Sequence, residues 1–321
     1  MAVINIIDYI TQHLDSKIFT LGIFIDLSKA FDTIDHKILL SKLENYGIRG
    51  TALNWFKSYL CNRKQAVEIN GNISYLGNIS CGVPQGSILG PLLFIIYIND
   101  IIYVSSMLKL ILFADDTNLL LHDKDLQNLM SNANTEIQKI SDWLKVNKLS
   151  LNIKKTHYIL FHSRQRKLTQ KPELKIDNCP IENVTSTKFL GIIINENLSW
   201  SNHISVLSNK ISKNIGILRA MSQKLPVSAL HMLYNTLIYP YLQYCNIAWA
   251  SCSNINTNNL FVLQKKPYVL YVKEGGTRTP HHYFVHWVLS SWLILISFKQ
   301  AVLCLVQLRK FYHHSLMTFS Y

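Results

Sequence analysis

Three aspartates stand at the ends of apolar segments that would normally exclude charge. Asp26 follows the run Phe19–Ile25, and Asp115 and Asp116 join two short apolar runs in LILFADDTNLL. Burying an unpaired carboxylate costs several kcal/mol. If the two segments are neighbouring strands, the carboxylates meet at one sheet edge, where divalent cations would relieve their repulsion. Hard cations such as Mg²⁺ prefer oxygen ligands, and two of them about 3.5 to 4 Å apart support in-line phosphoryl transfer. Taken alone, an Asp-Asp pair is more often a plain polar turn.

The elements that must position these carboxylates follow from hydrophobic periodicity and turn residues. The pattern predicts a buried strand over 19–25, a hairpin over 108–121 with Asp115 and Asp116 at its tip, and a second hairpin over 64–80. It also predicts a buried helix over 87–104, strand-like sequence over 156–195, and further helices over 3–14, 35–46, 51–61, 125–147 and 202–249.

Charge is distributed unevenly along the chain. The net charge is +13, yet residues 1–144 carry 11 basic and 14 acidic residues, whereas residues 145–266 carry 16 basic and 4 acidic ones. An acidic first part followed by a basic second part is typical of a catalytic body joined to a polyanion-binding surface. The alternative, lysines that only keep a helical face soluble, is equally compatible with charge alone.

Composition excludes several classes of protein. With 49% hydrophobic residues, 12 Gly and 8 Pro among 321 residues, the chain is neither collagen-like nor disordered. Its six cysteines have no metal-ligand spacing and no signal peptide precedes them, which indicates a reducing intracellular setting. The longest apolar stretch, 284–298, is shorter than the ~20 residues that a membrane span needs.

Several ordered motifs accompany the aspartates. They are FIDLSKAFDTIDH at 24–36, GVPQGSILGP at 82–91, FADD at 113–116, NIKKT at 152–156, KFLG at 188–191, YPYL at 239–242, and Trp249. Together they resemble the reverse transcriptases of non-LTR retrotransposons, of the LINE or Jockey-like kind, over residues 1–266. The resemblance implies an α+β fold: a right-hand polymerase palm, with an antiparallel sheet packed on helices, over 1–195, followed by a helical thumb over 196–266.

The resemblance also implies roles for single residues. Asp26, Asp115 and Asp116 would hold two Mg²⁺ ions, with Mn²⁺ as a substitute, one ion activating the primer 3′-hydroxyl and the other neutralising the triphosphate. Phe31 would be the aromatic gate that clashes with a ribonucleotide 2′-hydroxyl. Lys155 would lie near the pyrophosphate leaving group.

Other motif residues would bind the nucleic acid or the nucleotide. In the loop 82–86, Gly82 and Gly86 allow close backbone approach, Pro84 stiffens the loop, and the Gln85 amide can bond the template or the incoming nucleotide. A tight primer-grip hairpin would contain Phe189, Leu190 and Gly191. Phosphate contacts in the thumb are expected from Lys210, Lys213, Arg219 and Lys224.

The chain departs from the family pattern at both ends. Members of the family carry a fingers region, and commonly an endonuclease, before the first motif. We expect neither in this chain, so the nucleotide pocket would be incomplete. From Pro267 onward the sequence no longer follows the family, and we interpret 267–321 as a divergent tail produced by a shifted reading frame. A genuine tail that packs on the thumb or touches a membrane is the alternative.

These observations predict an RNA-directed DNA polymerase of a mobile element that transfers deoxynucleotides to a primer 3′-hydroxyl, with DNA integration as the wider process. Its partners would be an RNA template, a DNA primer and deoxynucleoside triphosphates, in the nucleus or cytoplasm, without secretion and without a stable membrane partner. A different hypothesis is an inactive remnant that still binds nucleic acid. A third, a membrane-associated protein anchored by 284–306, rests on composition, and oligomeric state stays open.

Overall fold

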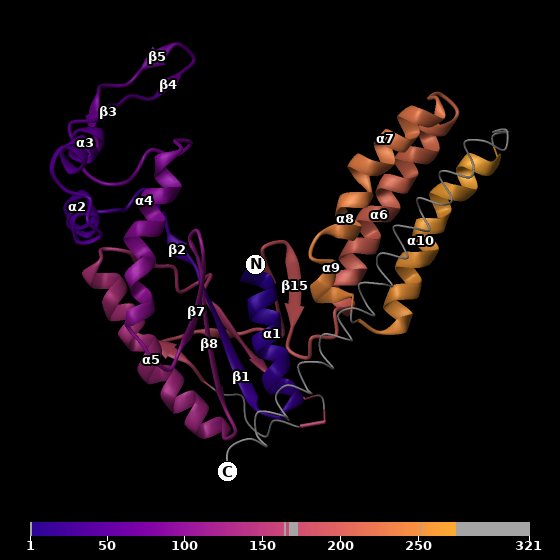
Figure 1. The fold of residues 1–321 in the computed structure, drawn as a ribbon, viewed down its shortest axis with the longest axis horizontal. Coiled ribbons are helices and arrows are strands. Elements are labelled where there is room, and N and C mark those ends of the chain that lie inside the picture. Colours follow the sequence, from indigo (N-terminus) through magenta and orange to yellow (C-terminus); the bar gives the residue numbers. More distant parts are fainter. Residues whose placement is uncertain (1, 164, 167–172, 251, 274–321) are drawn as a thin grey trace. The chain divides into compact units, whose positions relative to one another are not determined.

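The computed structural model describes residues 2–163, 165–166, 173–250 and 252–273. They form two compact units, one over residues 4–185 and one from Ser186 onward (Figure 1). The first unit is mixed α and β, and the second is mostly helical. The predicted α+β class is therefore confirmed at this level.

A five-stranded sheet forms the centre of the first unit, in the order β13-β10-β1-β8-β7. The strands are β1 (Phe19–Ile25), β7 (Lys109–Phe113), β8 (Asp116–Asp123), β10 (His157–Phe161) and β13 (Glu182–Asn183). All neighbours are antiparallel except β13, which runs parallel to β10 through two residue pairs. The expected antiparallel sheet is thus mixed at one edge.

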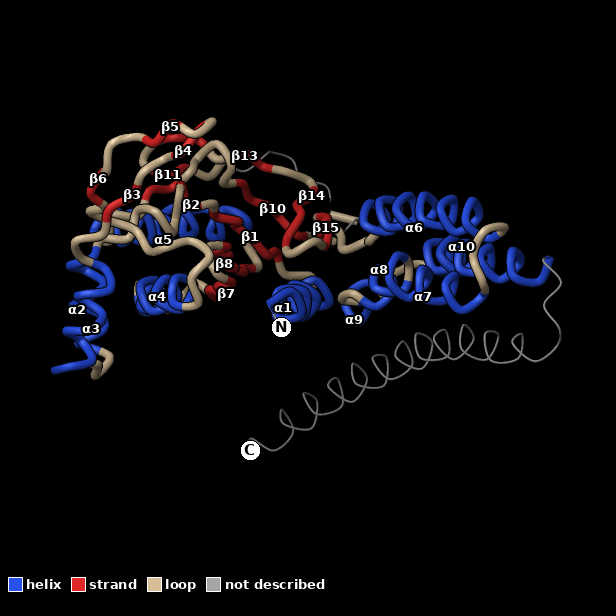
Figure 2. Tube along the Cα trace, turned by 90° about the horizontal axis from the view of Figure 1, so that it is seen from above, coloured by secondary structure: helices blue, strands red, loops and turns tan. Residues whose placement is uncertain are grey.

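Strand β1 lies in the middle of this sheet and is buried along its whole length. Its apolar, partly β-branched sequence suits a strand that pairs on both sides and is covered on both faces. Phe19, Leu21, Ile23 and Ile25 point into the main core. On the other face, His122 of β8 hydrogen-bonds through Nδ1 to the Tyr9 hydroxyl of helix α1 (Ala2–Asp15), 2.6 Å apart. Figures 1 and 2 show α1 and α5 on opposite sides of the sheet.

The remaining helices of this unit pack on the core face. They are α2 (His36–Asn45), α3 (Gly50–Leu60), α4 (Leu89–Ile98), the 3₁₀ helix η1 (Asn99–Tyr103) and α5 (Leu126–Val146). Helix α5 buries Leu129, Ala133, Ile137, Ile140 and Leu144, as its periodicity predicts. The buried helix expected over 87–104 is wrong in two respects. The segment changes from α to 3₁₀ geometry at Asn99. Residues near both of its ends are exposed to solvent, with Ile88 95% and Tyr103 82% exposed.

The hairpin predicted over 64–80 forms only in short pieces. Strand β3 (Lys64–Gln65) pairs with β6 (Gly77–Asn78), and β4 (Glu68–Ile69) pairs with β5 (Asn72–Ile73). Asn70 and Gly71 both have positive φ, as the predicted tight turn requires. Two further pairs are short: β2 (Leu27–Ser28) with β9 (Ser150–Leu151), and β11 (Lys175–Ile176) with β12 (Cys179–Pro180).

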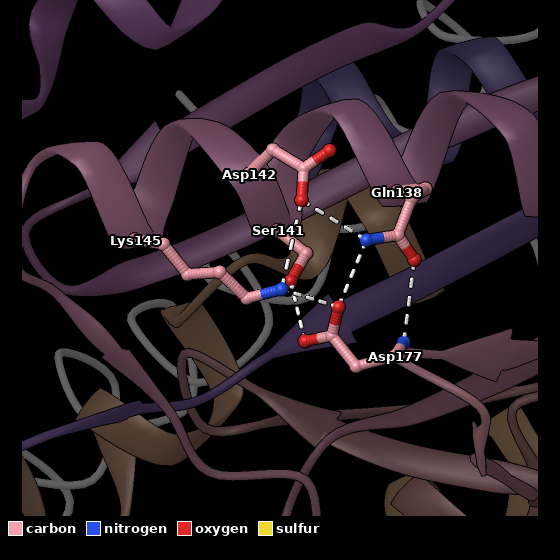
Figure 3. A network of polar contacts seen from close by, with 5 residues as sticks. All are labelled: Gln138, Ser141, Asp142, Lys145 and Asp177. Carbon is pink, nitrogen blue, oxygen red and sulfur yellow. Dashed lines mark hydrogen bonds and ion pairs between the residues drawn. The ribbon is translucent and has the colours of Figure 1, made fainter.

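A polar network fastens helix α5 to the β11–β12 hairpin (Figure 3). The Asp177 carboxylate, at the hairpin turn, accepts hydrogen bonds from Gln138 and Ser141 and pairs with Lys145. Lys145 also lies 3.5 Å from Asp142. The bond from Gln138 is the largest cause that lowers the pKa of Asp177, to about 2, followed by the Lys145 contact. This network therefore stabilises the fold most when Asp177 is ionised.

The second unit starts with the hairpin of β14 (Ser186–Phe189) and β15 (Ile192–Asn195). Helices α6 (Ser201–Ser222), α7 (Val227–Leu237), α8 (Tyr239–Gln243), α9 (Asn246–Trp249) and α10 (Asn254–Lys273) follow. Helix α6 packs on α7, on α10 and on β15, and Figure 2 shows α6, α7 and α10 side by side. The predicted breaks near Pro226 and Pro240 fall at the starts of α7 and α8. Helix α10 continues past residue 266.

Across the residues that the structure describes, no helix is both long enough and apolar enough to cross a membrane. The segment 284–306, from which a membrane anchor was considered, and the tail from 274 onward lie outside the described residues.

Candidate active site

The three aspartates come together where β1 and β8 end side by side. Ile25 pairs with Thr117, so Asp26 and Asp116 each lie one residue beyond this pair on neighbouring antiparallel strands. Phe113 pairs with Asp116, which leaves Ala114 and Asp115 as a two-residue turn. The expectation that the strands are neighbours is confirmed. Asp115 is exposed at the tip, and Ala114 adopts a φ of 52°, a strained conformation of the kind that collects at functional sites.

The carboxylates repel one another. Partial burial raises the pKa of Asp116 above its ordinary value, and the negative charges of Asp115 and Asp26 raise it further. Such a cluster has excess negative charge at neutral pH, which a bound cation would compensate. The donor set is chemically suited to Mg²⁺, although no group of three or more acidic, His or Cys side chains in the described residues is arranged closely enough to hold a metal ion.

The loop 152–156 holds Asp26 in place. The Asn152 side chain donates from Nδ2 to Asp26 Oδ2 at 2.9 Å, and its backbone N–H donates to the Asp26 carbonyl at 2.9 Å. The Asp26 N–H bonds to Thr156 Oγ1 at 3.3 Å. Lys155 is exposed in the same turn. Sequence reasoning missed Asn152 as a site residue, because nothing in NIKKT shows that it contacts a residue 126 positions earlier.

The expected aromatic gate and the glycine-rich loop lie together. The backbone N–H of Val83 donates to the Phe31 carbonyl at 2.9 Å, and the Phe31 ring packs 4.8 Å from that of Phe94. Gln85 donates from Nε2 to Asp32 Oδ1 at 2.8 Å. Asp32 is the second residue that sequence reasoning missed, and its place directly after Phe31 was the available signal.

Two glycines of this loop differ in their surroundings. A Cβ on Gly82, where φ is +85°, would lie 2.7 Å from the Asp32 carbonyl oxygen, whereas one on Gly86, where φ is +81°, would meet nothing within 4 Å. Close backbone approach is therefore a structural need at Gly82. Pro84 is partly buried, and its carbonyl accepts a bond from Ser87 Oγ at 2.7 Å.

The hairpin expected to grip a primer has the predicted tight turn. Phe189 pairs with Ile192, and both turn residues have positive φ, 44° at Leu190 and 82° at Gly191. This pattern is that of a two-residue type I′ turn. The Tyr244 hydroxyl donates to the Leu190 carbonyl at 2.6 Å, which fixes the turn to the helical part of the second unit. Phe189 is buried.

The four basic residues expected to contact phosphates are all exposed, but they do not form one stripe. Lys210 and Arg219 are nine residues apart on α6, so they lie about 180° apart around the helix. Lys210 Nζ lies 5.4 Å from the centre of the Tyr241 ring. Lys213 points away from the buried stripe, and Lys224 follows the end of the helix.

Comparison with known families finds the features described above together in one protein family. A family model described as reverse transcriptase (RNA-dependent DNA polymerase) matches residues 5–194. The chain belongs to the reverse transcriptase family. The match contains all three aspartates, the glycine-rich loop and the turn at Leu190 and Gly191. Reverse transcriptases depend on divalent metal ions and bind a nucleic-acid template and primer.

Relatives from mobile elements support the assignment. The chain is 26% identical over 272 residues to a probable RNA-directed DNA polymerase from transposon X-element of Drosophila melanogaster, and 24% identical over 272 residues to the polymerase from mobile element jockey of the same organism. Each match covers 82% of this chain and 29% of the relative. A solved telomerase of Candida tropicalis aligns over 90% of the chain and 52% of its own, with 12% identity and a TM-score of 0.46. The assignment rests on the sequence matches.

Proposed function

We propose that this chain is the palm and thumb part of an RNA-directed DNA polymerase of a non-LTR mobile element, with the palm over 1–195 and the thumb over 196–266. The observation that carries the proposal is the meeting of Asp26, Asp115 and Asp116 at the ends of two neighbouring strands, where partial burial, and after it the charges of Asp115 and Asp26, raise the pKa of Asp116. Carboxylates are the oxygen ligands that hard cations such as Mg²⁺ prefer, and such groups hold the metal ions of nucleotidyl transfer. Its substrates would be deoxynucleoside triphosphates and a primer paired to RNA.

Each site residue then has a role that its surroundings support. Asp26, Asp115 and Asp116 would hold two Mg²⁺ ions, which supply charge neutralisation and a more acidic primer hydroxyl. Asn152 would fix the direction of the Asp26 carboxylate. Lys155, exposed in the same turn, would supply positive charge to the leaving pyrophosphate.

The nucleotide would be bound by the loop that carries Gln85 together with Phe31. Because Phe31 is held by the Phe94 ring and by the backbone of the 82–86 loop, its ring cannot move aside cheaply for a 2′-hydroxyl. Gln85, whose Nε2 bonds to Asp32, presents its remaining amide atoms for hydrogen bonding. Gly82, Pro84 and Gly86 would shape this loop.

In the second unit, the turn at Phe189, Leu190 and Gly191 would support the primer end. The exposed cations would contact phosphates along the template and primer, without reading sequence; they are Lys210, Lys213, Arg219 and Lys224. Since these cations surround α6, we expect the contacts to involve more than one face of the helix.

The decisive experiment is dTTP incorporation on a poly(A) template with an oligo(dT) primer, with and without Mg²⁺. The wild-type chain is compared with Asp115→Asn and with the control Glu68→Gln, which removes one exposed carboxylate from strand β4. We expect Mg²⁺-dependent incorporation that falls at least about 100-fold in Asp115→Asn and is unchanged in Glu68→Gln. Equal incorporation by wild type and Asp115→Asn would refute the metal site.

A second candidate function is nucleic-acid binding without catalysis, favoured by the basic excess of residues 145–266. In that case the wild-type chain would bind the same primer and template with a strong salt dependence but would incorporate no dTTP. The incorporation assay and a binding titration, made on the same preparation, separate the two functions.

A further inference from the structure

A row of aromatic side chains on helix α3, in a stretch of the sequence rich in basic residues, has no part in the functions described so far. Residues 45–67 contain four basic residues and no acidic one, whereas residues 1–144 as a whole have more acidic than basic residues. The basic residues are Arg49, Lys57, Arg63 and Lys64. A local positive segment in an otherwise acidic part of the chain is suited to a negatively charged partner.

Within this segment, two aromatic rings and a guanidinium follow each other at four-residue steps. The Trp55 and Tyr59 rings are stacked, with centroids 5.5 Å apart and planes 9° apart. The Arg63 guanidinium lies 5.5 Å from the centre of the Tyr59 ring. Residues four apart share one side of a helix, so the three form a continuous row from α3 into the turn after it.

The Trp55 side chain is exposed to solvent and at the same time packed against neighbouring aromatic rings. It is 54% exposed, although large aromatic side chains are usually well buried. Phe56 meets its ring edge-on at 5.2 Å, and Phe56 itself packs against the main core. The indole is therefore fixed in orientation before any partner arrives, which lowers the entropic cost of binding.

We propose that this row binds a single-stranded nucleic acid, with a base stacked on the exposed Trp55 ring and neighbouring phosphates contacted by Arg63 and Lys64. Flat aromatic rings beside cations are the usual means of binding single strands without sequence preference. Between Glu44 and Glu68 the chain carries four basic residues and no acidic one, and this local positive charge favours a polyanion over an apolar protein partner. The identity of the strand, an unpaired part of the template, rests on the proposed function; binding itself does not.

The test is a binding titration of the full chain with a labelled oligo(A) of about 12 nucleotides, in RNA and DNA form, and with a blunt duplex. Trp55→Ala is compared with Trp55→Phe and with Tyr103→Ala, which removes another exposed aromatic ring, from η1. We expect Trp55→Ala to weaken single-strand binding about 10-fold, Trp55→Phe to restore most of it, and Tyr103→Ala to have no effect. Duplex binding should not change in any variant.

Arg63 gives a second readout. Arg63→Ala should lower the slope of log K against log salt by about 0.7 for single strands, while Arg63→Lys keeps the slope and loses affinity, because the planar contact with Tyr59 is lost. Preference for RNA over DNA would identify contacts to the 2′-hydroxyl, and equal binding would assign recognition to bases and phosphates alone.

The outcomes separate this proposal from the proposed function. Equal single-strand affinity in wild type and Trp55→Ala, with normal dTTP incorporation, would overturn the α3 surface and leave the polymerase intact. A Trp55-dependent affinity without any incorporation would support the surface and refute the polymerase. Equal losses for single strand and duplex in Trp55→Ala, or a lowered melting temperature, would indicate a structural role for Trp55 and also overturn the proposal.

Discussion

Neutralising Asp116 should make the protein more stable while it removes catalysis. Asp116 lies beside Asp26 on the neighbouring strand and follows Asp115 directly. Partial burial raises the pKa of the Asp116 carboxyl most, and the charges of Asp115 and Asp26 raise it further. In Asp116→Asn the side chain keeps its size and its polar oxygen but loses the charge. The folded state without metal then loses a repulsion that the unfolded chain hardly feels.

The size of the effect follows from the strand spacing. The Cα atoms of neighbouring antiparallel residues lie about 5 Å apart. With this spacing taken as the distance between the two charges, the repulsion is about 0.8 kcal/mol in water and about 3.3 kcal/mol at an effective dielectric constant of 20. Asp116 is only partly buried and remains open to solvent, so solvent screening places its repulsion with Asp26 near the lower limit, about 1 kcal/mol. For a unit of this size, that free energy raises the melting temperature by about 2 to 4 °C.

The effect of Asp116 on stability changes with pH in the opposite direction to that of a carboxylate in an ion pair. Because the folded pKa of Asp116 is raised from 3.8, the destabilisation is fully present above the folded pKa and disappears as pH falls below the unfolded value. Thermal unfolding in EDTA should thus show Asp116→Asn above wild type at neutral pH and equal to it near pH 3. Adding Mg²⁺ should raise the melting temperature of wild type more than that of the variant.

Glu68→Gln is the matched control, since it removes one negative charge from an exposed strand outside the site. A melting temperature of Asp116→Asn at or below that of wild type at neutral pH would refute the argument, because it would mean that the three carboxylates do not repel one another. A rise of equal size in both variants would trace the effect to net charge rather than to the site.

Two further predictions concern the packing of the first unit, one at helix α5 and one at the glycine-rich loop. Asp177→Asn should lower the free energy of unfolding by about 1 kcal/mol at neutral pH, after allowance for solvent screening. Since the pKa of Asp177 is lowered from 3.8 to about 2, this difference between variant and wild type should vanish as pH falls through about 2. Urea unfolding midpoints at several pH values would check it. Gly82→Ala should lower the free energy of unfolding by about 2 kcal/mol or more and lower dTTP incorporation, because the new Cβ meets the Asp32 backbone. Gly86→Ala should cost only about 1 kcal/mol, from backbone strain alone. Similar losses of stability in the two variants would contradict the close approach at Gly82.

The sequence was most informative where one physical signal dominated. The uninterrupted apolar run over 19–25 predicts a strand buried on both faces, and β1 is such a strand. The periodicity over 125–147 gives both the bounds of α5 and its buried face. The tight turn at Asn70 and Gly71 was likewise expected from its residue types, and both residues have positive φ. In each case the relevant interactions lie within a few residues or depend only on burial.

Sequence periodicity failed where neighbours far along the chain decide the outcome. The run 87–104 is nearly all apolar, so pattern alone indicates a buried helix. In the structure, the main core of the first unit covers only one side of α4, and Leu92 and Ile95 stay about half exposed. Apolar character measures what could be buried, while the number of packing partners decides what is buried.

The carboxylate cluster shows why the motif residues were easier to name than their supports. Asp26 and Asp116 are conspicuous because charge at the end of an apolar strand carries a cost that function must justify. Asn152 and Asp32 carry no such cost, since polar residues in surface loops are ordinary, and their roles depend on single hydrogen bonds to Asp26 and Gln85. The reason is physical. Residues that destabilise the fold can be recognised from the sequence, whereas the residues that orient them can be recognised only from the positions of the loops in the structure.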